Sequence, residues 1–147
     1  RRSRPAGQVK CGSTTMIVDT NVLVRAWSGD DERQALQARS QITAAERVFV
    51  SNTALCEFVW VARQIYRQKR VDIAQAIRLL IADERIIVDR PAIEEGLAFL
   101  EAGGDFADGV IEFEGRKLGG DTFVTFDKRA ASIIRAKGRE CVLLSAD

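Results

Sequence analysis

Five short apolar runs recur along the chain, and segments with helical periodicity separate them. The runs span Met16–Val18, Arg47–Val50, Arg85–Val88, Thr122–Thr125 and Glu140–Leu144. Strands that alternate with helices are typical of α/β domains whose sheet is mainly parallel. A chain of 147 residues is long enough for one such domain with a buried core. The pattern therefore predicts a single three-layer domain with five strands.

Apolar residues at helical spacing predict the helices between these strands. The clearest segments are 53–68, 71–82, a stretch that starts at Pro91, 105–118 and 128–137. Asp72 and Asp105 stand where a side chain can cap the start of a helix. Gly103-Gly104 and Gly138 stand where helices end.

The first fifteen residues differ from the rest, being polar, basic and without periodicity. The single methionine is Met16, so we expect residues 1–15 to be a vector-derived or disordered extension and residues 16–147 to form the domain. This extension holds four basic residues and no acidic ones. Without it, 18 basic residues remain against 21 acidic ones, so the overall charge does not indicate nucleic-acid binding.

Residue composition excludes several classes of chemistry. Histidine is absent, which removes Ser-His-Asp and Cys-His catalysis and most zinc sites. Cys11, Cys56 and Cys141 are widely spaced and odd in number, which predicts a reducing, cytoplasmic location without a disulfide framework. No apolar run approaches the roughly 20 residues that span a bilayer, so no membrane association is expected.

Asp19 and Asp127 each follow an apolar strand directly. In open α/β sheets, side chains at the carboxyl ends of strands face the ligand-binding crevice. The polar run Asp19-Thr20-Asn21 also interrupts two apolar runs, which is costly unless these groups are paired or bind a ligand. The alternative is that each aspartate only caps the helix that follows.

Glu57 is the one charged residue of an otherwise apolar helical segment, 54–62. Such a segment predicts burial on several sides, so the carboxylate needs a basic partner or a metal ion. Thr53, one turn earlier on the same face, is a candidate hydrogen-bond partner. A buried salt bridge is the alternative.

Asp108 occupies the third position of the helix that we expect Asp105 to cap. It is a candidate inward-facing acid, although both aspartates could simply interact with the helix dipole. Glu112, one turn later, is a candidate auxiliary ligand. Converging carboxylates repel each other, and a hard divalent cation such as Mg²⁺ relieves that repulsion through oxygen ligands.

Two clusters of basic residues and two tryptophans are candidates for contact with nucleic acid. Ordinary solvent-exposed helix faces remain the favoured interpretation of the basic clusters, and core or interface packing that of Trp27 and Trp60. The clusters are Arg63, Arg67, Lys69 and Arg70, and Lys128, Arg129, Arg135, Lys137 and Arg139.

Four motifs in order resemble the PIN domain, and specifically the VapC-type toxins of bacterial toxin–antitoxin pairs. They are Val18-Asp-Thr-Asn21, Glu57 on a helix, Phe106-Ala-Asp-Gly109 and Val124-Thr-Phe-Asp127. The resemblance extends from Met16 to about Ser145. Any one motif is weak, whereas all four in order are specific.

This resemblance implies an α/β/α sandwich with a parallel sheet ordered 3-2-1-4-5 and a Mg²⁺- or Mn²⁺-dependent endoribonuclease. It implies an acidic quartet of Asp19, Glu57, Asp108 and Asp127. The polar positions Thr20, Asn21 and Thr125 would support these acids. It also implies a homodimer and inhibition by a small cognate antitoxin of the VapB kind, which in turn binds operator DNA.

The chemistry expected from the residues agrees with that family. Without histidine, hydrolysis of RNA needs a metal ion that lowers the pKa of water and stabilises charge on phosphate oxygens. The products would carry a 5′-phosphate and a 3′-hydroxyl. Asn21 argues against a haloacid-dehalogenase-type phosphatase, which needs a second aspartate there. A PIN nuclease of RNA processing that is not a toxin, and a non-catalytic repressor or antitoxin-binding protein, remain alternatives.

Overall fold

The structure, a computed structural model, describes residues 14–145 and contains seven helices and five strands within that range. The helices are α1 (Thr20–Ser28), α2 (Glu32–Ala44), α3 (Asn52–Gln64), α4 (Arg70–Ala82), α5 (Arg90–Glu101), α6 (Phe106–Lys117) and α7 (Lys128–Ala136). The strands are β1 (Thr15–Ile17), β2 (Arg47–Phe49), β3 (Ile86–Ile87), β4 (Thr122–Thr125) and β5 (Glu140–Leu143). The α/β class and the parallel strands expected from the sequence are confirmed.

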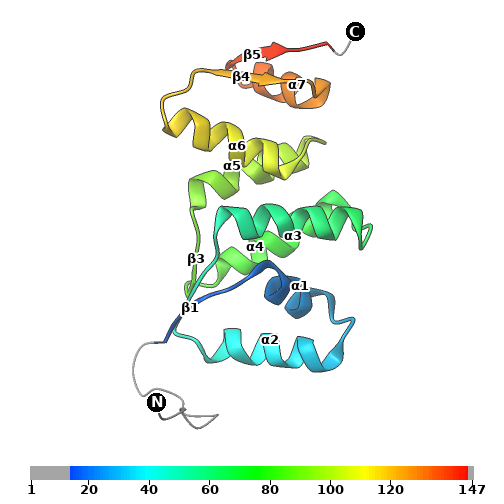
Figure 1. Cartoon of the computed structure of the whole chain (residues 1–147), viewed down its shortest axis with the longest axis vertical. Helices are drawn as coiled ribbons and strands as arrows, with labels where there is room; N and C mark the ends of the chain where they lie inside the picture. Colours follow the sequence, from blue (N-terminus) through cyan, green and yellow to red (C-terminus); the bar gives the residue numbers. More distant parts are fainter. Residues whose placement is uncertain (1–13, 146–147) are drawn as a thin grey trace, which may run out of the picture.

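The five strands form two separate parallel sheets. One sheet has the order β1-β2-β3, and the other pairs β4 with β5. Figure 1 shows β1 and the β4–β5 pair toward opposite ends of the long axis, with α3, α5 and α6 between them. The order 3-2-1-4-5 of one continuous sheet is therefore not confirmed, because β1 and β4 do not pair in the described part of the chain.

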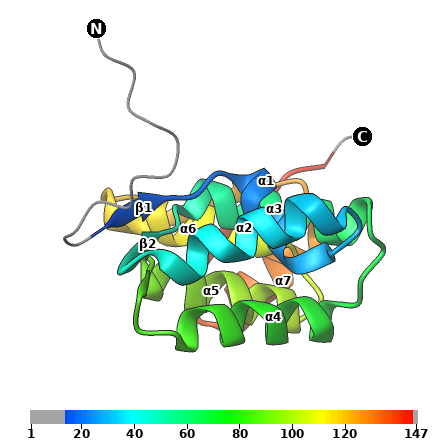
Figure 2. The same ribbon diagram turned by 90° about the horizontal axis from the view of Figure 1, so that it is seen from below.

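Each sheet is covered by helices on one face. In the three-stranded sheet, Val48 and Ile86 belong to the main core, and Met16 packs against that core. In the two-stranded sheet, Phe123 and Cys141 pack on a smaller core formed by Phe99 and residues of α7. Figure 2, seen along the long axis from the end formed by α2, shows β1 and α4 on opposite sides of α2.

Local sequence explains the helix boundaries. Asp19, Asp31, Ser51, Asp89 and Asp127 each accept a hydrogen bond from a backbone N–H at the start of a helix, as expected of N-cap residues. Helix α3 ends at Gln64, four residues before the end of the helix expected over residues 53–68. The prediction of a cap at Asp72 is wrong, since Lys69 precedes α4 without a side-chain cap and Asp72 lies in its first turn.

Helices α5 and α6 form a hairpin in which the two backbones lie close together. A Cβ at Gly109 would lie 2.5 Å from the backbone oxygen of Glu95, and one at Gly96 would lie 2.7 Å from the Phe106 ring. Both glycines are buried, so the two helix backbones approach closely only because side chains are absent. This contact fixes where the start of α6, with Asp108, stands.

The start of the fold lies slightly before Met16. Thr15 begins β1, and the carbonyl of Thr14 accepts hydrogen bonds from the N–H groups of Glu46 and Arg47. The expected extension of residues 1–15 otherwise falls outside the described residues. No helix among those described is long and apolar enough to cross a membrane.

Candidate metal centre

Three aspartates meet at the N-terminal ends of α6 and α7. One carboxylate oxygen from each of Asp105, Asp108 and Asp127 lies within 4.8 Å of the other two. Within residues 14–145 this is the one group of three or more His, Cys, Asp or Glu side chains with such spacing. Asp108 and Asp127 were predicted from the sequence, and Asp105 is an addition.

The start of each helix determines where its aspartate lies in the cluster. Asp105 occupies the N-cap position of α6, but its side chain accepts no capping hydrogen bond and joins the cluster instead. Asp127 caps α7, where its Oδ1 accepts from the N–H groups of Arg129 at 2.8 Å and Ala130 at 3.1 Å. The N–H of Asp127 donates to Thr125 Oγ1 at 3.0 Å, which holds the turn after β4.

The cluster perturbs the titration of its central member. Burial, together with the negative charges of Asp105 and Asp127, raises the pKa of Asp108 to about 6. The N-terminal ends of α6 and α7 favour negative charge nearby, which offsets part of this repulsion. The cluster is therefore an anionic site with an unfavourable excess of charge.

The donor set fits a hard divalent cation. Mg²⁺ takes oxygen ligands at about 2.0–2.1 Å, so two ligands on opposite sides of the ion are about 4 Å apart. Three carboxylate oxygens within 4.8 Å of one another meet that spacing with small side-chain movements. Nitrogen and sulfur ligands are absent from the cluster, which disfavours zinc.

Asp19 and Glu57 lie together elsewhere, in a hollow between α1 and α3. The hollow is also lined by Asn21, Arg25 and Tyr66. Asp19 Oδ1 accepts from the N–H of Thr20 at 2.7 Å, and Thr20 Oγ1 donates to Glu57 Oε2 at 2.8 Å. Thr20 thus connects the first and second acids of the predicted quartet.

The predicted burial of Glu57 is wrong. Its side chain is exposed, because α3 buries only one face, formed by residues such as Leu55, Phe58 and Val59. The partner expected for Glu57 was Thr53, yet the hydrogen bond comes from Thr20, a residue far along the chain. Thr53 is exposed at the start of α3.

The quartet is divided between two places. Asp108 and Asp127 meet with Asp105, whereas neither Asp19 nor Glu57 belongs to that group. The physical reason is the sheet: Asp19 follows β1 and Asp127 follows β4, and these strands belong to different sheets. The spacing of three residues between Asp105 and Asp108 is a signal for Asp105 in the sequence, but the same spacing also fits a helix cap and interaction with the helix dipole.

Glu112 is not available as an auxiliary ligand. It is 5% exposed and accepts hydrogen bonds from Arg116 at 2.6 Å and Arg139 at 2.9 Å. Arg139 and Lys137 also bind Glu95, at 3.1 Å and 3.0 Å. These contacts connect α7 and β5 to the α5–α6 hairpin, so Lys137 and Arg139 serve the fold.

The two tryptophans have different environments. Trp27 packs edge-on against Phe58 and Tyr66, at centroid distances of 5.3 Å and 5.4 Å, as expected for a core residue. Trp60 is 60% exposed, so of the two environments predicted for it, core packing is wrong and packing at a subunit interface stays a prediction. Trp60 and Arg63 line a hollow whose wall includes Asp105, so an aromatic ring and a guanidinium stand beside the cluster.

Comparison with known proteins places the chain in a family. The PIN domain matches residues 16–136, most of the chain. A VapC ribonuclease of Aquifex aeolicus (strain VF5) is 28% identical over 120 residues, which cover 77% of this chain and 87% of that protein. The match includes Asp19, Glu57, Asp108 and Asp127 within its bounds. The chain belongs to the PIN-domain family.

Proposed function

We propose that this protein is a metal-dependent endoribonuclease and the toxin of a toxin–antitoxin pair. The observation that carries the proposal is the convergence of Asp105, Asp108 and Asp127 at two helix N-termini in a PIN-domain chain. The similarity to a protein named VapC ribonuclease supports RNA as the substrate. The proposed site adds Asp19 and Glu57, the remaining acids of the predicted quartet.

The cluster would hold Mg²⁺ or Mn²⁺ through Asp105, Asp108 and Asp127. When bound, such an ion lowers the pKa of water and stabilises negative charge on phosphate oxygens. Asp108 must lose its proton to act as a ligand, and its raised pKa means that protons compete with the ion increasingly as the pH falls toward 6 and below. Asp127 is oriented for its role by the hydrogen bonds that it makes at the start of α7.

Groups that surround the cluster are suited to bind RNA. Lys128 and Arg129, in the first turn of α7, follow Asp127 and are exposed, so they can contact phosphates. Trp60 offers an exposed ring on which a base can stack, and Arg63 stands beside it. Together these residues would position a phosphodiester at the three carboxylates.

The proposed partners are a small antitoxin and a second copy of the chain. An apolar hollow between α1, α2, α3 and α4 supports the antitoxin proposal, with Trp27, Leu55, Phe58 and Leu79 among its lining residues. Operator DNA would be bound through the antitoxin. The proposed location is the cytoplasm, consistent with the free thiols of Cys56 and Cys141.

The test is cleavage of total cellular RNA by the purified chain. We expect cleavage with Mg²⁺ or Mn²⁺, none with EDTA, and 5′-phosphate ends in the products. Asp127→Asn should abolish cleavage while the protein stays folded. Asp121→Asn is the matched control, because Asp121 is exposed and its carboxylate accepts a hydrogen bond from the neighbouring Thr122 hydroxyl. Full cleavage in EDTA, or by the Asp127 variant, would refute the proposal.

A further inference from the structure

Asp127 belongs to the last unit of the chain, which consists of β4, α7 and β5 and is called the C-terminal unit below. Figure 1 shows these three elements together at one end of the molecule, beyond α5 and α6. Asp105 and Asp108 lie instead at the start of α6. The distance from Asp127 to the other two carboxylates therefore depends on how the C-terminal unit is held against the α5–α6 hairpin.

The aspartate cluster does not by itself hold these two parts together. Its three carboxylate oxygens lie within 4.8 Å of one another, and like charges at such distances repel. Apolar packing opposes the repulsion, and the small core of the C-terminal unit consists of Phe99, Ala130, Ile133 and Ile134. Apolar packing is not directional, so a directed contact is needed to fix α7 at one place along α6.

A buried ion pair one helical turn from Asp108 provides such a contact. Glu112 follows Asp108 by four residues and so lies on the same face of α6. It is 5% exposed, and its Oε2 accepts a hydrogen bond from Arg139 Nη1 at 2.9 Å. Arg139 lies between the end of α7 and the start of β5. The pair therefore joins α6 to the C-terminal unit on the helix face that carries Asp108.

Arg139 contacts both helices of the hairpin at once. While its Nη1 donates to Glu112 on α6, its Nη2 donates to Glu95 Oε1 on α5 at 3.1 Å. Arg116 donates to the other oxygen of Glu112 at 2.6 Å, which fixes the orientation of that carboxylate. A guanidinium holds its donors in a rigid plane, so contact on two sides fixes orientation as well as distance.

Helix α7 connects this anchor to Asp127. Asp127 caps its first turn, and Arg139 follows its last turn by three residues. The nine residues of α7 form a rod about 14 Å long. Midway along it, Ile133 packs so closely on Gly104 that a Cβ there would lie 2.7 Å from Ile133 Cδ1. A rod that packs at its middle and is anchored at one end has its other end restrained too.

We propose that Glu112 and Arg139 are positioning residues of the metal centre. They hold α7 against α6 so that Asp127 stays within ligand distance of Asp105 and Asp108 before an ion binds. Ligands that are already arranged bind a cation more tightly, because less of the chain has to be ordered on binding. Neither residue is a ligand, and their roles rest on the metal centre of the proposed function.

The sign of the expected effect separates positioning from charge. Arg139→Met removes a positive charge, and charge alone would then strengthen the binding of a cation. Loss of positioning should instead weaken binding by about tenfold, as is found for residues that orient metal ligands. Arg135→Met is the matched control, because Arg135 is exposed on the same helix and donates to the Cys141 carbonyl at 3.4 Å. It should bind the ion at least as tightly as the wild type.

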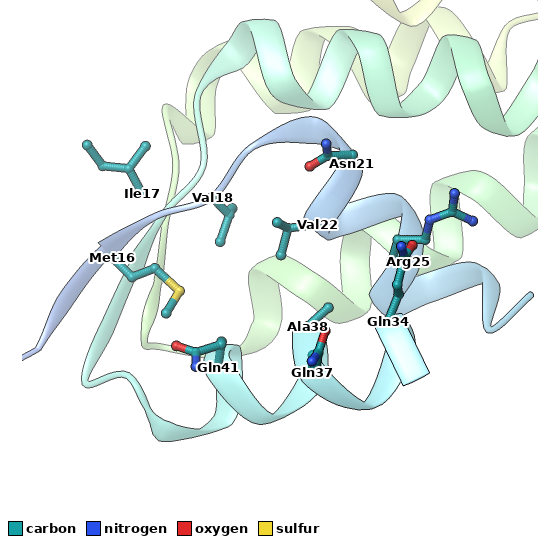
Figure 3. A pocket seen from close by; sticks show the side chains of 10 residues that line it. All are labelled: Met16, Ile17, Val18, Asn21, Val22, Arg25, Gln34, Gln37, Ala38 and Gln41. Carbon is teal, nitrogen blue, oxygen red and sulfur yellow. The ribbon is translucent and has the colours of Figure 1, made fainter. Parts of the chain in front are cut away.

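Other oxygen donors in the chain make it necessary to assign the bound ion to its site. Asp19 and Glu57 line the hollow between α1 and α3. Figure 3 shows a second hollow, beside β1, whose lining has no carboxylate and whose polar side chains are Asn21, Arg25, Gln34, Gln37 and Gln41. Asp127→Asn removes a ligand from the cluster and leaves both hollows intact. Loss of tight binding in that variant assigns the ion to the cluster.

The experiment is a titration of the metal-free protein with Mn²⁺ at neutral pH, without RNA. The electron paramagnetic resonance signal of free Mn²⁺ gives the dissociation constant, and circular dichroism verifies that each variant is folded. A purely structural role of Arg139 would lower thermal stability but leave the affinity of the folded protein unchanged. Arg139→Lys is included because lysine keeps the charge but has no rigid fork to bridge two carboxylates, so it should bind roughly threefold more weakly.

Weaker binding by Arg139→Met, with Arg135→Met unchanged or tighter, supports the proposal. Wild-type affinity in folded Arg139→Met, or equal weakening in both variants, overturns it and leaves the metal centre standing. If Arg139→Met does not fold, Arg139→Lys decides, and wild-type affinity in that variant overturns the proposal. A wild type that binds no Mn²⁺, or an Asp127→Asn variant that binds it equally well, overturns the metal centre and the positioning roles together.

Discussion

Asp108→Asn tests whether charge repulsion among the three aspartates lowers the stability of the folded protein. Burial and two neighbouring carboxylates raise the pKa of Asp108 from 3.8 to about 6. The folded protein therefore holds a proton that the unfolded chain has already lost between about pH 4 and pH 6. Stability must fall as the pH rises through this window. Asparagine cannot ionise, so the variant should escape that loss.

The expected change in unfolding free energy follows from the size of the pKa shift of Asp108. At about 1.4 kcal/mol for each pH unit, a change from 3.8 to about 6 corresponds to about 3 kcal/mol. Asp108 is only half-buried, so solvent screens much of this. The variant also loses a favourable carboxylate interaction with the start of α6, about 0.5 kcal/mol. We expect a net gain of about 1 kcal/mol at pH 7.5, or roughly 3 °C in Tm.

Thermal unfolding in EDTA from pH 4 to pH 8 measures this directly. The wild type and the Asn variant should have similar Tm values near pH 4, separate as the pH rises from about 4 to about 6, and stay separated above pH 6, with the variant more stable. Added Mg²⁺ should stabilise the wild type and leave the variant nearly unchanged. An equal or lower Tm for the variant at pH 7.5 in EDTA would refute the electrostatic argument.

The other predictions concern the first acid, the helix contact and the buried ion pair. Asp19→Asn should abolish RNA cleavage yet retain the fold, because asparagine also caps helices well; an active variant would exclude Asp19 from the site. Gly109→Ala should cost about 1–3 kcal/mol of unfolding free energy in urea, since its Cβ meets backbone at 2.5 Å. Gly115→Ala, with open space around it, should instead stabilise by about 0.5–1 kcal/mol. Arg139→Met should cost about 2 kcal/mol, because the buried Glu112 then keeps only Arg116 as a partner, and Glu112→Leu in the same chain should restore part of it; additive losses would contradict the pairing.

Local features of the fold were predictable from the sequence. Apolar spacing located the helices, and the strand Thr122–Thr125 has the predicted bounds. These features depend on neighbours in the chain, whose preferences are readable in a short window. The aspartates that follow β1 and β4 were recognised in the same way.

Contacts between elements far apart in the chain were harder to predict from the sequence. Whether β1 pairs with β4, which it does not among the described residues, depends on how α5 and α6 hold the last strands, and no local pattern records this. The exposure of Glu57 depends on which face of α3 is covered, and its apolar neighbours gave the wrong answer. Spacing places Asp105 at the N-cap of α6 but does not reveal which way its side chain turns.

The Glu112–Arg139 contact has a consequence for how this protein can change over generations. Loss of Arg139 alone leaves the buried Glu112 carboxylate with Arg116 as its remaining partner, whereas replacement of both by apolar residues removes the buried charge together with its partner. Intermediate sequences with one partner alone should therefore be poorly tolerated. In descendants of this chain, we expect positions 112 and 139 to be substituted together, whereas Glu95, which also binds Lys137, should be replaced more independently.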